Sequence, residues 1–98
     1  MPITHERTEF LLPVIALFYG IIIMMYAGDN EHNPPHFHAK YNEYRAAYDF
    51  EGNIIEGNMP PRQHRMISGW AAAHEDDLIA DWELCKAGLQ PWKITDRI

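Results

Sequence analysis

The stretch that decides the fold is residues 36–49, which reads HFHAKYNEYRAAYD. Its centre, Asn42-Glu43, suits a two-residue hairpin turn, because Asn tolerates the positive φ that such turns require. This turn pairs Lys40 with Arg45, and side chains alternate between the two faces of a strand. One face is therefore predicted to be apolar and the other polar: Phe37, Ala39, Tyr41, Tyr44, Ala46 and Tyr48 on the first, and His36, His38, Lys40, Arg45 and Asp49 on the second.

Upstream of this hairpin lies an uncharged run of 18 residues, Phe10–Ala27. Its length fits a membrane span or the core of a signal peptide. Pro13 and Gly20 interrupt the run, however, and the β-branched Ile21–Ile23 favours a strand. We therefore expect an extended piece that starts at Pro13, then a central strand over Gly20–Tyr26 covered on both faces, and no contact with a membrane.

Downstream of the hairpin the pattern changes from strand to helix. A second hairpin through Gly52-Asn53 is predicted to pair Phe50 with Ile55. Two helices are expected over about 60–74 and 75–87, the first opened by two prolines and the second by three acids. The fold class is α+β: a small, mostly antiparallel sheet of three to four strands, followed by two helices packed on one face. Residues 1–11 are predicted to be an N-terminal extension, and 12–98 a single domain.

Composition limits the classes of function. The formal net charge of −6 argues against a protein that coats DNA or RNA, although a local basic patch stays compatible with it. Cys85 is the only cysteine, so an internal disulfide is impossible and the chain fits the reducing cytoplasm.

The polar face of the hairpin carries side chains suited to proton transfer near neutral pH. In a catalytic interpretation, His36 (oriented by Asp49) and His38 exchange protons on an RNA phosphodiester. Cationic side chains bind the phosphate and the charge that develops on it. The candidates for this phosphate site are Lys40, Arg45, Arg62 and Arg65.

Two further interpretations of the same residues stay open. In the first, His36 and His38 offer two imidazoles to a divalent metal such as zinc, and His32 or Asp29 completes the shell. The spacing lacks the signature of a zinc finger. In the second, the histidines are structural and the polar face is solvated or binds a partner protein. The exposed edge strands of so small a sheet also allow a homodimer or β-augmentation.

A set of short motifs runs through most of the chain: Gly20–Ile23, Asp29-Asn30, His32–His38, Glu56–Pro60, Gln63, Trp70, Asp81–Leu84 and Ala87-Gly88. With these residues the sequence resembles the bacterial family called domain of unknown function 4160, from about residue 12 to 95. The His-Asn-x-Pro-His-x-His run is the most specific part. Such proteins are often encoded beside a second small protein, so the resemblance implies a member of a toxin–antitoxin-like pair with a small cognate partner. It implies no particular reaction.

Overall fold

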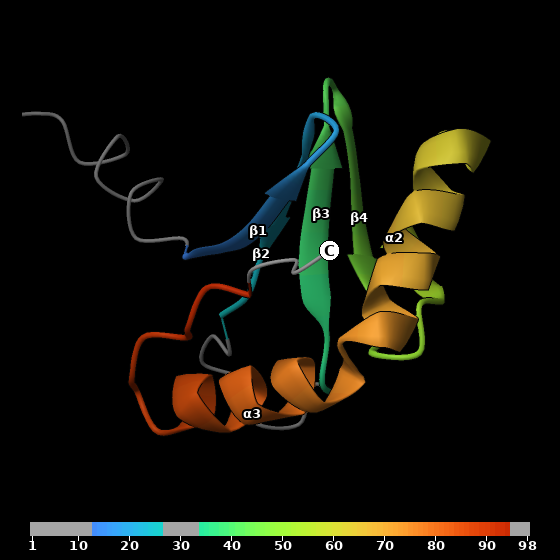
Figure 1. The fold of residues 1–98 in the computed structure, drawn as a ribbon. Helices are drawn as coiled ribbons and strands as arrows, with labels where there is room; N and C mark the ends of the chain where they lie inside the picture. Colours follow the sequence, from blue (N-terminus) through green and yellow to red (C-terminus); the bar gives the residue numbers. More distant parts are fainter. Residues whose placement is uncertain (1–12, 27–33, 95–98) are drawn as a thin grey trace, which may run out of the picture.

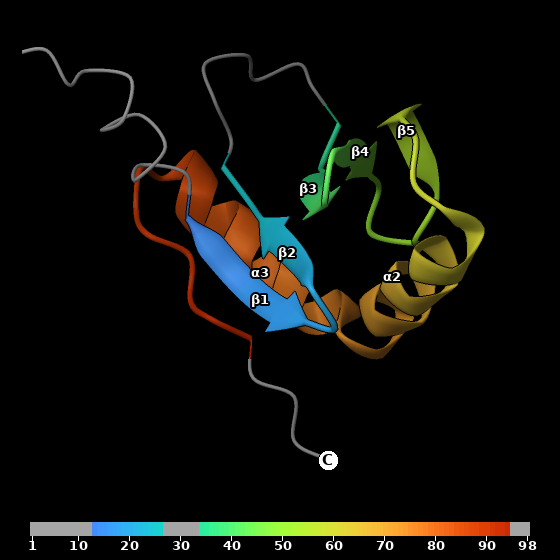
Figure 2. The ribbon, with the colours of Figure 1, turned by 90° about the horizontal axis from the view of Figure 1, so that it is seen from above.

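The computed structural model describes residues 13–26 and 34–94. In chain order these residues form β1 (Val14–Phe18), β2 (Ile21–Met24), β3 (Phe37–Tyr41), β4 (Tyr44–Tyr48), β5 (Ile54–Gly57), α2 (Pro61–Ala73) and α3 (Glu75–Lys86). All neighbouring strands are antiparallel, in the order β1-β2-β3-β4-β5 (Figures 1 and 2). The predicted α+β class is confirmed, with five strands in place of the expected three to four.

The uncharged run folds back on itself and supplies β1 and β2, where the sequence predicts an extended piece and a central strand. Tyr19 and Gly20 both have positive φ, +50° and +79°, and so form a tight turn between β1 and β2. The expectation that β2 is covered on both faces is wrong. Ile21 and Ile23 are fully buried, whereas Ile22 and Met24, which point to the other face, are only half-buried. No helix within 13–26 and 34–94 is long and apolar enough to cross a membrane.

The register of the central hairpin is confirmed. Lys40 pairs with Arg45 and His38 with Ala47, and Asn42 takes the positive φ of +53° that the turn requires. Because side chains alternate, Phe37 and its partner Tyr48 both point into the core, where neither is exposed.

The second hairpin exists, but its predicted register is wrong. Tyr48 pairs with Ile54 and Ala47 with Glu56, so the connection spans 49–53 rather than two residues. The cause is the Asp49 carboxylate, which accepts hydrogen bonds from the backbone N–H groups of Glu51 and Asn53, both at 2.9 Å. Such local side-chain bonds to the backbone compete with strand pairing.

The helices cover the sheet from one face and one end. α2 lies along one face, and α3 crosses beneath the ends of the strands (Figures 1 and 2). Their buried residues join the apolar sheet side chains in one core, in which the Trp70 ring meets Phe37 edge-on at 5.6 Å. We call the face of the sheet opposite α2 the open face, because none of the described helices covers it.

Gly57 at the end of β5 tests how tightly this sheet is built. It has φ +87°, and a Cβ there would collide with the carbonyl oxygen of Arg45. Gly57→Ala is expected to lower the free energy of unfolding by about 2–3 kcal/mol. Gly69→Ala is the matched control, since Gly69 lies in α2 with nothing near its absent Cβ. That change should raise stability by about 0.5–1 kcal/mol. Urea unfolding measures both, and equal effects would contradict this description of β5.

Candidate functional site

Side chains on the open face stand in two rows that follow the strand pairing. One row is Val14, Met24, His38, Ala47 and Glu56, and the next is Leu17, Ile22, Lys40 and Arg45. The half of the face on β1 and β2 is therefore apolar, and the half on β3, β4 and β5 carries the ionisable groups. The predicted placement of His38, Lys40 and Arg45 on one side of the hairpin is confirmed by this register.

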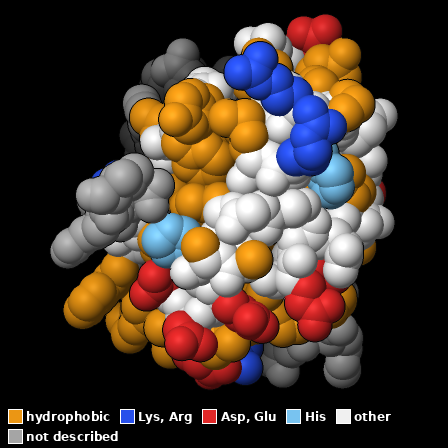
Figure 3. All heavy atoms as spheres, turned by 45° about the vertical axis from the view of Figure 1, so that its right-hand side comes forward, with side chains coloured by type: hydrophobic (Ala, Val, Ile, Leu, Met, Phe, Trp, Pro, Cys, Tyr) orange, Lys and Arg blue, Asp and Glu red, His pale blue; other side chains and the backbone are white. Residues whose placement is uncertain are grey.

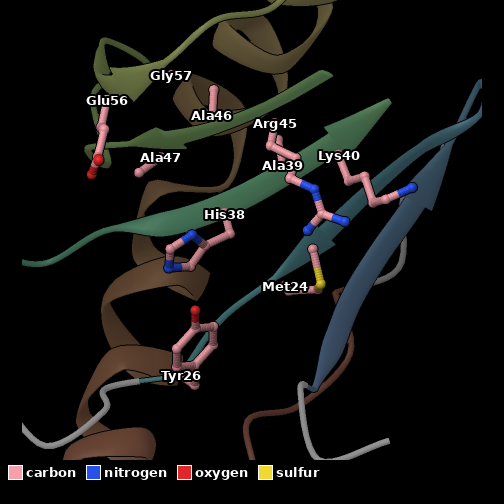
Figure 4. Close-up of a pocket in the computed structure, with 10 residues that line it drawn as sticks. All are labelled: Met24, Tyr26, His38, Ala39, Lys40, Arg45, Ala46, Ala47, Glu56 and Gly57. Carbon is pink, nitrogen blue, oxygen red and sulfur yellow. The ribbon is translucent and has the colours of Figure 1, made fainter. Parts of the chain in front are cut away.

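A hollow of about 260 Å³ lies in the ionisable half of the open face (Figure 4). It exists because two of the positions on its floor are small: Ala47 has only a methyl group and Gly57 has no side chain. Longer side chains stand around them. The residues that line the hollow are Met24, Tyr26, His38, Ala39, Lys40, Arg45, Ala46, Ala47, Glu56 and Gly57.

His38 is the most constrained side chain of the hollow. Its ring stacks on the ring of Tyr26, with centroids 4.8 Å apart and planes 9° from parallel, and meets the edge of His36 at 4.9 Å. Its Nε2 is buried and has no hydrogen-bond partner among the described residues. Buried polar atoms are nearly always bonded, so an unpaired one calls for an explanation.

The surroundings of His38 favour the neutral imidazole. Burial lowers the pKa of His38, nearby His36 lowers it further, and Glu56 acts in the opposite direction. Since an unperturbed histidine titrates near 6.5, His38 is neutral at pH 7. A neutral imidazole has one basic nitrogen, so His38 is able to accept a proton or to bind a group that enters the hollow.

His36 contacts His38 but does not line the hollow. It precedes β3, and its Nδ1–H donates to the carbonyl of Pro34 at 2.8 Å. Its ring lies 5.3 Å from that of Trp82, on α3. The predicted pair of catalytic histidines is thus close together, but only His38 lines the hollow.

Asp49 does not orient His36 as predicted. Its carboxylate is occupied by the backbone of the 49–53 turn and by the side-chain amide of Asn53, at 3.2 Å. The pairing of β3 with β4 stops at Phe37 and Tyr48, so position 36 has no partner across the hairpin.

The four predicted phosphate-binding residues are divided between two places. Arg45 reaches over the hollow, whereas Lys40 extends away from His38, with its Nζ donating to the carbonyl of Asn42 at 3.1 Å (Figure 4). Arg62 and Arg65 lie on α2, against the other face of the sheet. The histidine between them, His64, shares a hydrogen bond of 2.9 Å with Tyr48, between its Nδ1 and the tyrosine hydroxyl.

The proposed zinc ligands are only partly within the described structure. Asp29 and His32 lie outside the described residues. Within 13–26 and 34–94, no group of three or more His, Cys, Asp and Glu side chains is placed to hold a metal ion. Zinc binding at His36 and His38 stays a prediction.

Seven of the residues that line the hollow were not identified as site residues from the sequence, and Tyr26, Ala47 and Glu56 are the three that bear on its chemistry. Tyr26 ends an apolar run and reads as core. Glu56 was missed because the predicted register of the second hairpin pairs it with Asp49 rather than with Ala47. In the structure Glu56 pairs with Ala47 and so joins the row of His38.

The family model for a domain of unknown function (DUF4160) matches residues 20–83. The chain belongs to this family. The match includes every residue that lines the hollow, so the hollow is part of the DUF4160 domain itself. No curated protein and no solved structure matches the chain.

The contact between His36 and His38 predicts a measurable titration. Nuclear magnetic resonance should give a pKa for His38 below 6.5 in the native chain, and His36→Asn should raise it, because the neighbouring imidazole is removed. Asn keeps a donor for the Pro34 carbonyl. The lowered pKa of His38 also makes the free energy of unfolding depend on pH. The stabilising contribution of neutral His38 is fully present above pH 6.5 and is lost as the pH falls through the pKa of His38 in the folded chain.

The control for this titration is His64→Gln, which changes a histidine on the other side of the sheet. It should leave the pKa of His38 unchanged. A His38 that titrates at or above 6.5 in the native chain would contradict the burial of its ring.

Proposed function

We propose that this chain is a cytoplasmic RNA-cleaving protein, the toxic member of a toxin–antitoxin-like pair, and that the hollow is its active site. The observation that carries the proposal is His38: a neutral imidazole whose Nε2 has no partner, in a hollow crossed by Arg45. A neutral base beside a cation is the equipment needed to deprotonate a ribose hydroxyl next to a phosphate.

The distribution of charge supports an RNA substrate despite the net charge of −6. Helix α3 alone holds five acids and one lysine. Figure 3 shows acidic side chains gathered at the end of the molecule where α3 lies. The hollow, on the open face, is lined by two cations and one carboxylate. A phosphate is thus repelled from the α3 end and attracted to Lys40 and Arg45.

The reaction is a transesterification within the RNA strand. His38 takes the proton of a 2′-hydroxyl, whose oxygen bonds to the adjacent phosphorus. The bond from phosphorus to the 5′-oxygen breaks, and this oxygen takes a proton from solvent. The products are a 2′,3′-cyclic phosphate and a 5′-hydroxyl, and His38 returns its proton to water. Arg45 balances the negative charge that grows on the phosphate oxygens.

Access to His38 requires a small movement. Because Nε2 has essentially no exposure, an incoming ribose must displace a side chain at the rim. Arg45 is suited to this role, since it is exposed and long. Changes of side-chain rotamer of this kind are common when a partner binds.

Cleavage of a single-stranded RNA oligonucleotide in excess EDTA tests the proposal. The native chain should release fragments that end in a cyclic phosphate, and His38→Gln should lower the rate by at least about 100-fold, the share typical of a general base. Arg45→Gln should weaken binding and reduce the slope of log K against log salt by about 0.7, the value for one lost phosphate contact on a single strand.

The matched control is Leu17→Ser, on the same face but outside the hollow. It should leave the rate unchanged. Cleavage that His38→Gln does not slow, in protein that unfolds at the same urea concentration as the native chain, would overturn the proposal. The same is true of a native chain that leaves RNA intact.

A second candidate function is a non-enzymatic binding module. It is favoured by the apolar half of the open face, where Val14 is 37% and Leu17 69% exposed. Exposed apolar patches of this kind mark contacts between proteins. The occupant proposed here is the small cognate partner, and a second copy of this chain or a zinc-dependent contact are the other outcomes. Leu17→Asp should abolish binding of the co-expressed partner and leave RNA cleavage intact.

A further inference from the structure

We propose that Glu56 is a positioning residue of the same site: its carboxylate, across the hollow from His38, stabilises the imidazolium that forms when His38 takes a proton from its substrate. This inference rests on the proposed function. In the sequence-based prediction the partner of His38 in catalysis is His36. In the present proposal the partner is Glu56, which lies across the sheet and lines the same hollow.

The strand register sets the geometry of this pair. His38 pairs with Ala47, and Ala47 pairs with Glu56, so the three positions form one row on β3, β4 and β5. Neighbouring strands lie about 4.8 Å apart, which puts the two ionisable residues roughly 10 Å apart at the backbone. The side chains of His38 and Glu56 shorten this distance. Ala47 lies between them and has only a methyl group, so it does not fill the space. The hollow between them has a volume of about 260 Å³.

An irregularity in β5 is what brings Glu56 to the open face. Ala47 pairs with Glu56 but its neighbour Tyr48 pairs with Ile54, so Ile55 is an extra residue in the strand. Without this bulge, strict alternation would put Ile55 opposite Ala47 and turn Glu56 away. Bulges re-aim side chains in this way and are common next to active sites.

The bulged strand is held firmly in place. The N–H of Asn58 donates to the carbonyl of Arg45 at 3.0 Å, directly after Gly57. Gly57 lies so close to the backbone of Arg45 and Ala46 that no other residue fits there without displacement. The position of Glu56 beside the hollow is therefore fixed by its own backbone, although its side chain is exposed.

The charges around His38 give Glu56 a distinct role. Burial and His36 lower the pKa of His38, whereas Glu56 raises it. Among the described residues, the ionisable groups near the ring are His36 before β3, Tyr26 after β2, Arg45 on β4 and Glu56 on β5. Lys40 on β3 also lines the hollow, but its side chain is directed away from the ring (Figure 4). Among the described residues that line the hollow, Glu56 is the single carboxylate, so it is the one that favours imidazolium by its charge.

Glu56→Gln in the full chain tests this role, because Gln keeps the shape and removes the charge. On the RNA oligonucleotide, kcat should fall about tenfold, the equivalent of one pKa unit. KM should stay unchanged or fall, since the same carboxylate repels the bound phosphate. The acid limb of the pH profile of kcat/KM should move to lower pH, together with the pKa of His38 measured by nuclear magnetic resonance.

The control is Glu43→Gln, in the turn between β3 and β4 and outside the hollow, which should change none of these quantities. The inference is overturned if the native chain cleaves RNA and Glu56→Gln leaves kcat and the acid limb in place. It is also overturned if the variant raises KM without moving that limb, because this is the signature of a merely structural role. A native chain that does not cleave RNA overturns the proposed function itself, and this inference with it.

Discussion

The alternation of side chains along β3 and β4 is the constraint on which the rest of the molecule depends. Phe37 and Tyr48 stack with ring centroids 5.4 Å apart and are fully buried against α2. A shift of the strand register by one residue would expose both rings. The loss of their buried apolar surface would cost several kcal/mol of stability. The burial of Phe37 and Tyr48 therefore also determines the face to which each residue between them points. Because Phe37 must point into the core, His38 must point to the open face.

Where local rules decide, the sequence is sufficient to predict the structure. The hairpin register follows from the alternation and from Asn42, both of which can be read from adjacent residues. The register of β5 follows instead from the Asp49 carboxylate, which captures backbone donors and lengthens the turn to 49–53. The pattern of apolar and polar residues does not indicate that a side chain competes with strand pairing for these backbone donors. Tyr26 and His36 owe their positions to ring contacts with His38 and with Trp82 of α3, which come from distant parts of the chain.

The separation of charge is what allows an acidic chain to carry the anion site that we propose. Acids are concentrated on α3, where Glu75, Asp76 and Asp77 also stabilise the positive end of the helix dipole. Arg62 and Arg65 lie on α2, on the other side of the sheet, and do not line the hollow. The field at the hollow is set by the few groups around it, because charges farther than about 8 Å are largely screened at physiological salt.

The opposing influences on His38 are consistent with a role in catalysis. Only an interaction that is stronger in the transition state than in the ground state accelerates a reaction. Burial and His36 keep the imidazole neutral before the reaction, so its electrostatic interaction with the Glu56 carboxylate is weak at that stage. In the proposed reaction the ring takes a proton, and the carboxylate of Glu56 then acquires a cationic neighbour. A residue that stabilised the imidazolium equally at rest would hold His38 protonated at neutral pH and remove the base on which the reaction depends.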